Sequence, residues 1–544
     1  MGDSPQNPSQ EQILDLLRTL ENRIARLESR LDLEQPETIV PETETAPTVA
    51  AEDDEELELR LGQNWFAKAG IVGLALGIAF LLTLPYSGFP SILPSLLGYA
   101  LVGGILFLSY FWKETFEQVS RYLLGGGLLL LYFTTLRLSY FTPDPALSNK
   151  SVELALLLIV VGGNLVVAVR RRSIYLAGFN LTLGFLTALL GVEPFYVLGI
   201  LTLLALTTST LTWKFNWNAL LSFGMFLTYL THLIWTSNNP FFGNEIRFGW
   251  APQMHLGFIL LYAIIFALPM ILRNERSTEG TAIILNSALN AAVGFGLFSV
   301  SILAGVTVSI VAWQAVASLL FLAMAIIFWI REKSVYSTFA YAMIGYAALS
   351  AAIVAQFPMP DFFVWLSWQS LLVVSTAVWF RSRFIVVANF AIYLTIFVAY
   401  LSAAGTVSSV SVSFGIIALL SARVLNWQKD KLALRTELMR NAYLASALLF
   451  LPYALYNSVP PHFVSVSWLV LAALYYLVGR WLKSRKYRWM ALLTMTLTIL
   501  YVFIVDLTTV DPVVRIISFL AVGIALLGIS MFYSRKKRKM VGNK

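Results

Sequence analysis

The sequence predicts an all-α fold: a polytopic integral membrane protein with about 18 transmembrane helices, preceded by a short coiled-coil helix. Three observations support this prediction. Of the 544 residues, 58% are hydrophobic and only 12% are charged, whereas soluble domains carry about 25% charged residues. Apolar segments follow one another from residue 67 onward, most of them close to the roughly 20 residues that a helix needs to cross a bilayer. Basic residues gather in every second connection between these segments.

Residues 1–35 are predicted to form a cytoplasmic coiled-coil helix. Ser9 can cap its start, and Gln12 completes a capping box three residues later. A helix this short would leave its apolar seam exposed if it stayed alone. We therefore expect residues 9–33 to self-associate or to bind a protein partner; the alternative is a single amphipathic helix on the membrane surface. The seam alternates in steps of four and three residues, a heptad pattern, through Ile13, Leu17, Leu20, Ile24, Leu27 and Leu31.

An acidic tether is predicted over residues 36–60. Residues 34–58 contain ten acidic side chains and no basic ones, with Pro41 and Pro47 among them. Like charges and prolines favour an extended, disordered chain. The tether leads into a transmembrane domain over residues 61–534, and a basic cytoplasmic tail follows over residues 535–544.

The transmembrane domain divides into apolar segments separated by short connections, an arrangement typical of tight helical hairpins. The predicted spans extend over residues 67–84, 91–111, 120–141, 151–169, 173–190, 194–212, 217–236, 253–272, 280–304, 307–330, 335–356, 361–380, 384–403, 406–426, 438–457, 461–482, 487–506 and 512–533.

The connections predict the orientation in the membrane. Positively charged loops face the cytoplasm, and the unbroken alternation requires an even number of spans. Both termini are therefore predicted to be cytoplasmic. The net charge of +8 is explained by these loops, so we expect membrane lipids and no nucleic acid as partners. The basic loops include Arg170–Arg172, Lys214, Arg331 with Lys333, Arg381 with Arg383, and Arg480 with Lys483.

Ionisable residues on the non-cytoplasmic side form the first candidate site. Charged groups within or near spans are costly and need a reason to be there. Arg137 can pair with a carboxylate such as Glu153, or extend to the lipid headgroups. The histidines show no metal-ligand spacing and the chain has no cysteine, so we predict no metal site and no cofactor. The candidates are Arg137, Glu153, His232, His255, Asp361, His462, Asp511 and Arg515.

Amides deep within the spans form a second candidate set, a polar path through the membrane. The alternative is that these amides hydrogen-bond helices to one another. The chain contains no phosphate-binding P-loop, no His-Glu-x-x-His and no Gly-x-Ser-x-Gly sequence, so no reaction is predicted. The path residues are Asn164, Asn286, Asn290 and Gln369.

The order of these parts resembles a bacterial family of predicted membrane proteins, domain of unknown function 2339. The resemblance implies placement in a bacterial inner membrane but no activity, so no catalytic residue follows from it. It rests on the heptad from Leu20 to Glu28, the acidic tether, the entry Leu61-Gly62-x-x-Trp65-x-x-x-x-Gly70-Ile71, and the ending Arg515-Ile516-Ile517-Ser518-Phe519-x-x-x-Gly523.

Three functions remain open from the sequence. The first is a cell-envelope membrane protein that handles a lipid-linked or polar substrate at its outer face, because the histidines and several charged residues lie on that side. The second is a transporter for a polar solute, which requires the amides to face one cavity. The third is a membrane scaffold that assembles partners through its coiled coil. Whether the protein is an enzyme is left open by all three.

Overall fold

A computed structural model describes residues 90–141, 145–191, 193–240, 243–247, 251–272, 280–304, 309–403, 408–427 and 436–506, together with the single positions 73, 77, 520, 523 and 524. The predicted coiled coil, the acidic tether and the basic tail lie outside the described residues. So do nearly all positions of the first and last predicted spans, and with them Asp511 and Arg515.

The described residues form an all-α structure without strands. A short helical turn, η3 (Pro461–Phe463), precedes α18, and a wider turn, η4 (Val502–Asp506), continues α19. The helices are α4 (Leu93–Phe111), α5 (Glu117–Leu136), α6 (Lys150–Arg170), α7 (Ile174–Leu190), α8 (Pro194–Phe215), α9 (Asn218–Thr236), α10 (His255–Ile271), α11 (Thr281–Leu303), α12 (Ile310–Glu332), α13 (Val335–Gln356), α14 (Asp361–Trp379), α15 (Arg383–Ala403), α16 (Ser408–Trp427), α17 (Thr436–Ser458), α18 (Val464–Trp481) and α19 (Arg485–Tyr501).

Fourteen of these helices are long and apolar enough to cross a membrane. The two others, α7 and α10, are apolar but have only 17 residues each. Every helix from α4 to α19 coincides with one predicted span. The total of 18 spans stays a prediction, because the first and last lie outside the described ranges. One difference in boundary concerns a candidate residue: the span predicted over residues 120–141 is α5, which ends at Leu136 and places Arg137 in the turn that follows.

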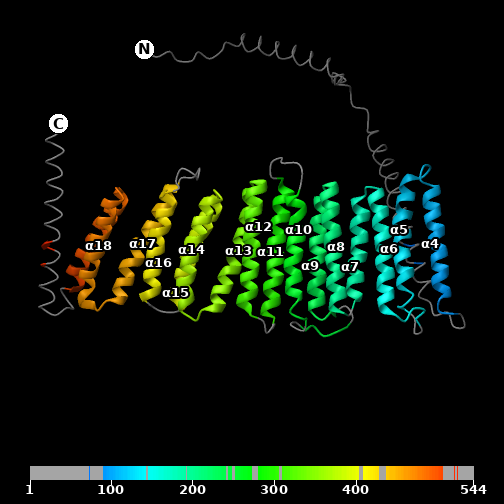
Figure 1. Ribbon diagram of the computed structural model, residues 1–544, viewed down its shortest axis with the longest axis horizontal. Coiled ribbons are helices and arrows are strands. Elements are labelled where there is room, and N and C mark those ends of the chain that lie inside the picture. Colours follow the sequence, from blue (N-terminus) through cyan, green and yellow to red (C-terminus); the bar gives the residue numbers. More distant parts are fainter. Residues whose placement is uncertain are drawn as a thin grey trace, which may run out of the picture.

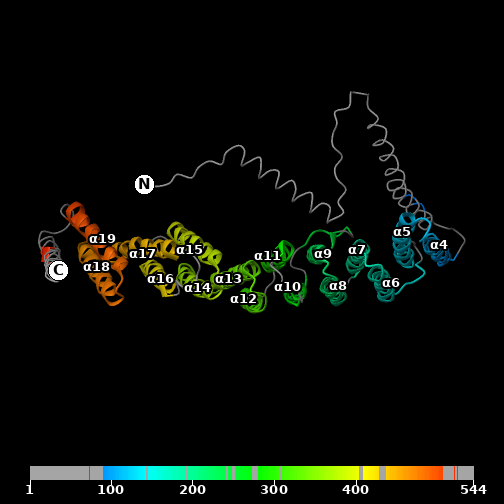
Figure 2. The same ribbon diagram turned by 90° about the horizontal axis from the view of Figure 1, so that it is seen from above.

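The helices stand side by side in a long row (Figure 1). Seen from above, the even-numbered helices from α6 to α18 lie on one side and the odd-numbered helices on the other (Figure 2). Substantial packing joins helices that are neighbours, or next neighbours, in the chain. The described part is therefore a linear double row, organised like a solenoid in which each unit contacts only adjacent units.

The apolar core lies between the two rows. One buried cluster runs from Ala168 on α6 to Ala491 on α19. Large side chains fill it, including Tyr262, Phe321 and Tyr341, none of which is exposed. The opposite faces of the helices carry many exposed apolar side chains. This distribution suits a bilayer, where lipid rather than protein covers the outer faces.

A repeated turn closes four of the helical hairpins. Its first residue is basic and exposed and has a φ near +50°, a conformation that usually favours glycine. The serine that follows begins the next helix, and its hydroxyl caps that helix at Ser173, Ser334 and Ser382. The four turns are Arg172-Ser173, Lys333-Ser334, Arg381-Ser382 and Lys483-Ser484.

Antiparallel packing places all four turns at the same edge of the double row, the upper edge in Figure 1, which we call the basic edge. The three histidines lie at the opposite edge, which we call the histidine edge. His232 belongs to the last turns of α9, His255 is the first residue of α10, and His462 lies in η3.

Candidate functional site

The histidine edge brings two of the three histidines into contact. His232 Nε2 lies 3.1 Å from His255 Nδ1. Both side chains are buried, with exposures of 0% and 2%. The ring of His232 also packs edge-on against Trp235 and Tyr262. The pair forms because α9 ends and α10 begins at the same edge, so that one connection returns the chain beside itself.

Hydrogen-bond accounting assigns the protons of this pair. His232 Nδ1 is buried without a hydrogen-bond partner. A buried N–H without an acceptor is costlier than a buried lone pair without a donor. The proton of His232 therefore belongs on Nε2, which donates to His255 Nδ1. His255 then carries its own proton on Nε2, and that group remains available as a donor.

A small open pocket adjoins the pair at the histidine edge. His255, Thr236 and Ser301 contribute polar groups to its wall, and Leu233 and Val300 contribute apolar surface. These residues come from α9, α10 and α11. The space is about 10 Å³, which is room for one water-sized group, so a ligand would place a small polar group there and its apolar body on the surface outside.

The turn between α5 and α6 holds a second buried group of polar residues. Arg137 and Glu153 are 2% and 1% exposed, and one Glu153 oxygen is buried without a hydrogen-bond partner. Ser139 Oγ donates to the carbonyl of Leu147 at 2.7 Å, which folds the turn back on itself. Burial raises the pKa of the Tyr140 phenol, and the nearby charge of Glu153 raises it further. The structure thus brings the predicted arginine and glutamate to adjacent helix ends.

The remaining described candidates, Asp361 and His462, lie elsewhere on the histidine edge. Asp361 is exposed in the first turn of α14, and His462 is exposed in η3. The described candidates are therefore distributed along the histidine edge as the histidine pair, two buried residues at neighbouring helix ends and two exposed side chains, rather than as one site.

Two of the predicted path amides lie on α11 and bind neighbouring helices. Asn286 accepts a hydrogen bond from Ser222 Oγ on α9 at 2.6 Å. Asn290 accepts one from Tyr229 Oη at 2.9 Å and donates one to Tyr341 Oη at 2.9 Å. Asn290 also donates to the Ala263 carbonyl on α10 at 2.8 Å, so it joins three helices of one row to a helix of the other.

The other two path amides lie in different interfaces. Asn164 on α6 donates to the Leu128 carbonyl on α5 at 3.3 Å. Gln369 on α14 donates to the Tyr346 carbonyl on α13 at 2.8 Å and exchanges hydrogen bonds with Ser350. Each amide has partners in its own packed interface, as expected for side chains that connect helices.

A comparison with protein families concerns the C-terminal part of the row. Residues 454–536 match the family of predicted membrane proteins DUF2339. The DUF2339 match covers the end of α17, η3, α18 and α19 and continues beyond the described residues. It confirms the predicted resemblance and the membrane character, and it carries no activity. It includes His462 but neither His232 nor His255. No curated protein and no solved structure matches the chain.

Proposed function

We propose that the protein is a multi-pass bacterial inner-membrane protein that binds a polar cell-envelope or lipid-linked substrate at its extracytoplasmic face, in the pocket beside His255. One observation carries this proposal: a buried histidine pair, with an N···N distance of 3.1 Å, adjoins an open pocket at the histidine edge. The orientation comes from the basic residues at the other edge, which favour the cytoplasm.

The wall of the pocket supports a lipid-linked ligand. His255 offers an N–H donor and Ser301 adds a hydroxyl, whereas the Thr236 hydroxyl already donates to the backbone carbonyl of His232. Leu233 and Val300 can contact an acyl or prenyl chain beside them. A ligand that lies partly among the lipid headgroups and partly in the hydrocarbon of the bilayer needs both polar and apolar contacts.

The histidine pair also fixes which atom of His255 can donate. Because His232 Nε2–H donates to His255 Nδ1, the neutral His255 ring carries its proton on Nε2. The proposal therefore includes binding of a group that accepts a hydrogen bond, such as a phosphate.

Binding of a polyprenyl phosphate to the purified, full-length protein in nanodiscs tests this function. Native mass spectrometry should detect a lipid adduct that His255→Ala weakens about tenfold, the loss expected for one hydrogen bond to a charged group. His462→Ala serves as the matched control, because His462 is exposed at the same edge. Equal adduct formation by the protein and His255→Ala would refute the proposal.

A second candidate function is a membrane scaffold, favoured by the linear double row. Because substantial packing joins only near neighbours in the chain, two long faces of the described helices are free to contact lipid or other membrane proteins. Deletion of residues 1–35 should then abolish assembly with partners, whereas binding of a polyprenyl phosphate should persist.

The transporter alternative has less support. Asn164, Asn286, Asn290 and Gln369 are hydrogen-bonded in separate helix interfaces, and a permeation path requires them to face one cavity. Solute flux into proteoliposomes above that of protein-free liposomes would restore this alternative.

A further inference from the structure

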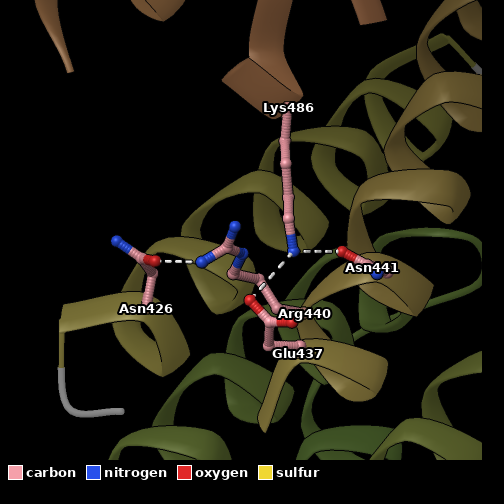
Figure 3. Close-up of polar contacts among 5 residues, drawn as sticks. All are labelled: Asn426, Glu437, Arg440, Asn441 and Lys486. Atoms are coloured by element: carbon pink, nitrogen blue, oxygen red, sulfur yellow. Dashed lines mark hydrogen bonds and ion pairs between the residues drawn. The ribbon is translucent and has the colours of Figure 1, made fainter. Parts of the chain in front are cut away.

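The basic edge contains one place where cations from three helices converge. Arg423 lies near the end of α16, Arg440 near the start of α17 and Lys486 near the start of α19. Figure 3 shows Arg440 and Lys486 extending toward the same space above α17. We call Arg423, Arg440 and Lys486 the cation cluster. Elsewhere on this edge, the basic residues of the repeated turns are exposed at the turn tips.

The hydrogen-bond partners of the cluster are mostly neutral. The Arg440 guanidinium donates to the side-chain oxygen of Asn426, and Lys486 Nζ donates to Asn441 Oδ1 at 2.6 Å (Figure 3). Among the described residues, the carboxylate paired with the cluster is that of Glu437, 3.9 Å from Lys486 Nζ. The Glu437 side chain is 78% exposed, so solvent weakens this pair.

The charges of the cluster do not balance. Among the residues that the structure describes, three cations against one carboxylate leave an excess of two positive charges. The charge of Arg440 repels Lys486, and the charge of Glu437 attracts it. The buried Tyr487 lies beside the cluster, where its phenol interacts electrostatically with Arg423 and Arg440. Cations held this close are stabilised by a bound anion.

Two helix starts add to the attraction for an anion. Both α17 and α19 begin at the cluster, and the first N–H groups of a helix favour negative charge. Ser484 precedes α19, but its side chain makes no capping hydrogen bond. The first amides of α19 are therefore not capped by Ser484.

The side chains around the cluster indicate which kind of anion it binds. Three exposed tryptophans lie on the same helix ends: Trp427 on α16, Trp481 on α18 and Trp489 on α19. Tryptophan is enriched where lipid headgroups meet hydrocarbon. Leu438, in the first turn of α17, is also exposed and can contact an acyl chain. These neighbours suit a lipid better than a free ion.

We propose that the cation cluster binds the phosphate of an anionic phospholipid between α16, α17 and α19. An arginine can contact two phosphate oxygens at once, and a lysine adds a point charge. Basic pockets between membrane helices bind lipid headgroups in this way. The site is independent of the pocket at His255, which lies at the opposite edge.

Native mass spectrometry of the full-length protein in detergent, titrated with phosphatidylglycerol or phosphatidylcholine, tests this inference. Phosphatidylglycerol, which is anionic, should bind more tightly than phosphatidylcholine. The double variant Arg440→Gln with Lys486→Gln should weaken its binding about 30-fold, since each basic residue near a lipid headgroup contributes about fivefold. Arg383→Gln, an exposed position on the same edge, should leave binding unchanged.

Two further arms make the test decisive. Glu437→Gln removes the competing carboxylate and should tighten phosphatidylglycerol binding, a gain that misfolding cannot produce. Inorganic phosphate at the same concentration should not displace the lipid. Equal affinity for the two lipids, or a double variant that still prefers phosphatidylglycerol, would overturn the inference. Displacement of the lipid by inorganic phosphate would also overturn the inference, because the anion bound by the cluster would then be a soluble phosphate.

Discussion

His232 Nε2 and His255 Nδ1 lie 3.1 Å apart, although 23 positions separate the two residues in the chain. Neither side chain has more than 2% of its surface exposed. The bond satisfies one nitrogen of each ring in an apolar surrounding, and it positions His255 beside the pocket.

Loss of the pair should reduce the stability of the protein. His232→Ala leaves His255 Nδ1 buried without its donor and opens a cavity beside Trp235 and Tyr262. We expect a loss of about 2–4 kcal/mol, measured as a lower midpoint of thermal unfolding in nanodiscs. His462→Ala should change the free energy by less than about 0.5 kcal/mol, because that side chain is exposed. An unchanged midpoint for His232→Ala would contradict the described contact.

Asn290 should contribute more to stability than an exposed polar residue of a helix. Asn290→Leu removes the hydrogen bonds to Tyr229 and Tyr341 and leaves both phenols buried. Hydrogen bonds between membrane helices contribute about 0.6–1.7 kcal/mol each, so we expect a total loss of about 1–3 kcal/mol. Thr395→Val is the control, since its hydroxyl is exposed and bonds only within its own helix. Equal unfolding midpoints for the two variants would show that the hydrogen bonds of Asn290 do not stabilise the packing of these helices.

Gly345 permits α13 to approach α12 closely. A Cβ at this position would lie 2.8 Å from Leu322 Cγ and 3.0 Å from the Leu322 backbone nitrogen. Gly345→Ala should therefore destabilise the protein by about 1–3 kcal/mol. Gly199→Ala on α8 meets nothing within 4 Å and should be neutral or stabilising by up to about 1 kcal/mol, because alanine favours the helix. A change of the same sign in the free energy of unfolding of both variants would argue against this close contact between α12 and α13.

The orientation can be measured directly, because the chain has no cysteine to give background. Asp361→Cys places a thiol at the histidine edge, and Lys333→Cys places one at the basic edge; both positions are exposed. In intact cells with a permeable outer membrane, a maleimide that cannot cross the inner membrane should label Asp361→Cys only. Lys333→Cys should react after the cells are broken. The reverse pattern would invert the membrane orientation and move the pocket at His255 to the cytoplasm.

The helices could be predicted well from the sequence, and the candidate site only in part. Every helix from α4 to α19 falls on a predicted apolar segment, because hydrophobicity over about 20 residues is a local property. The histidines could be assigned to one edge by counting spans. Their pairing could not be predicted, since it depends on how two helix ends meet. The partners of Asn290 were also missed: a tyrosine within an apolar segment carries no sign that it will meet an amide on another helix.

The sequence by itself determined an all-α membrane protein with most of its basic residues at one edge and its histidines at the other. Composition and charge alternation suffice for this, because solvent and lipid act on each segment separately. Only the tertiary structure decided that the described helices form a linear double row, that His232 meets His255, and that Arg440 and Lys486 converge. Such contacts depend on the packing of helices, and Asn290 reaches partners 61 and 51 positions away through that packing alone.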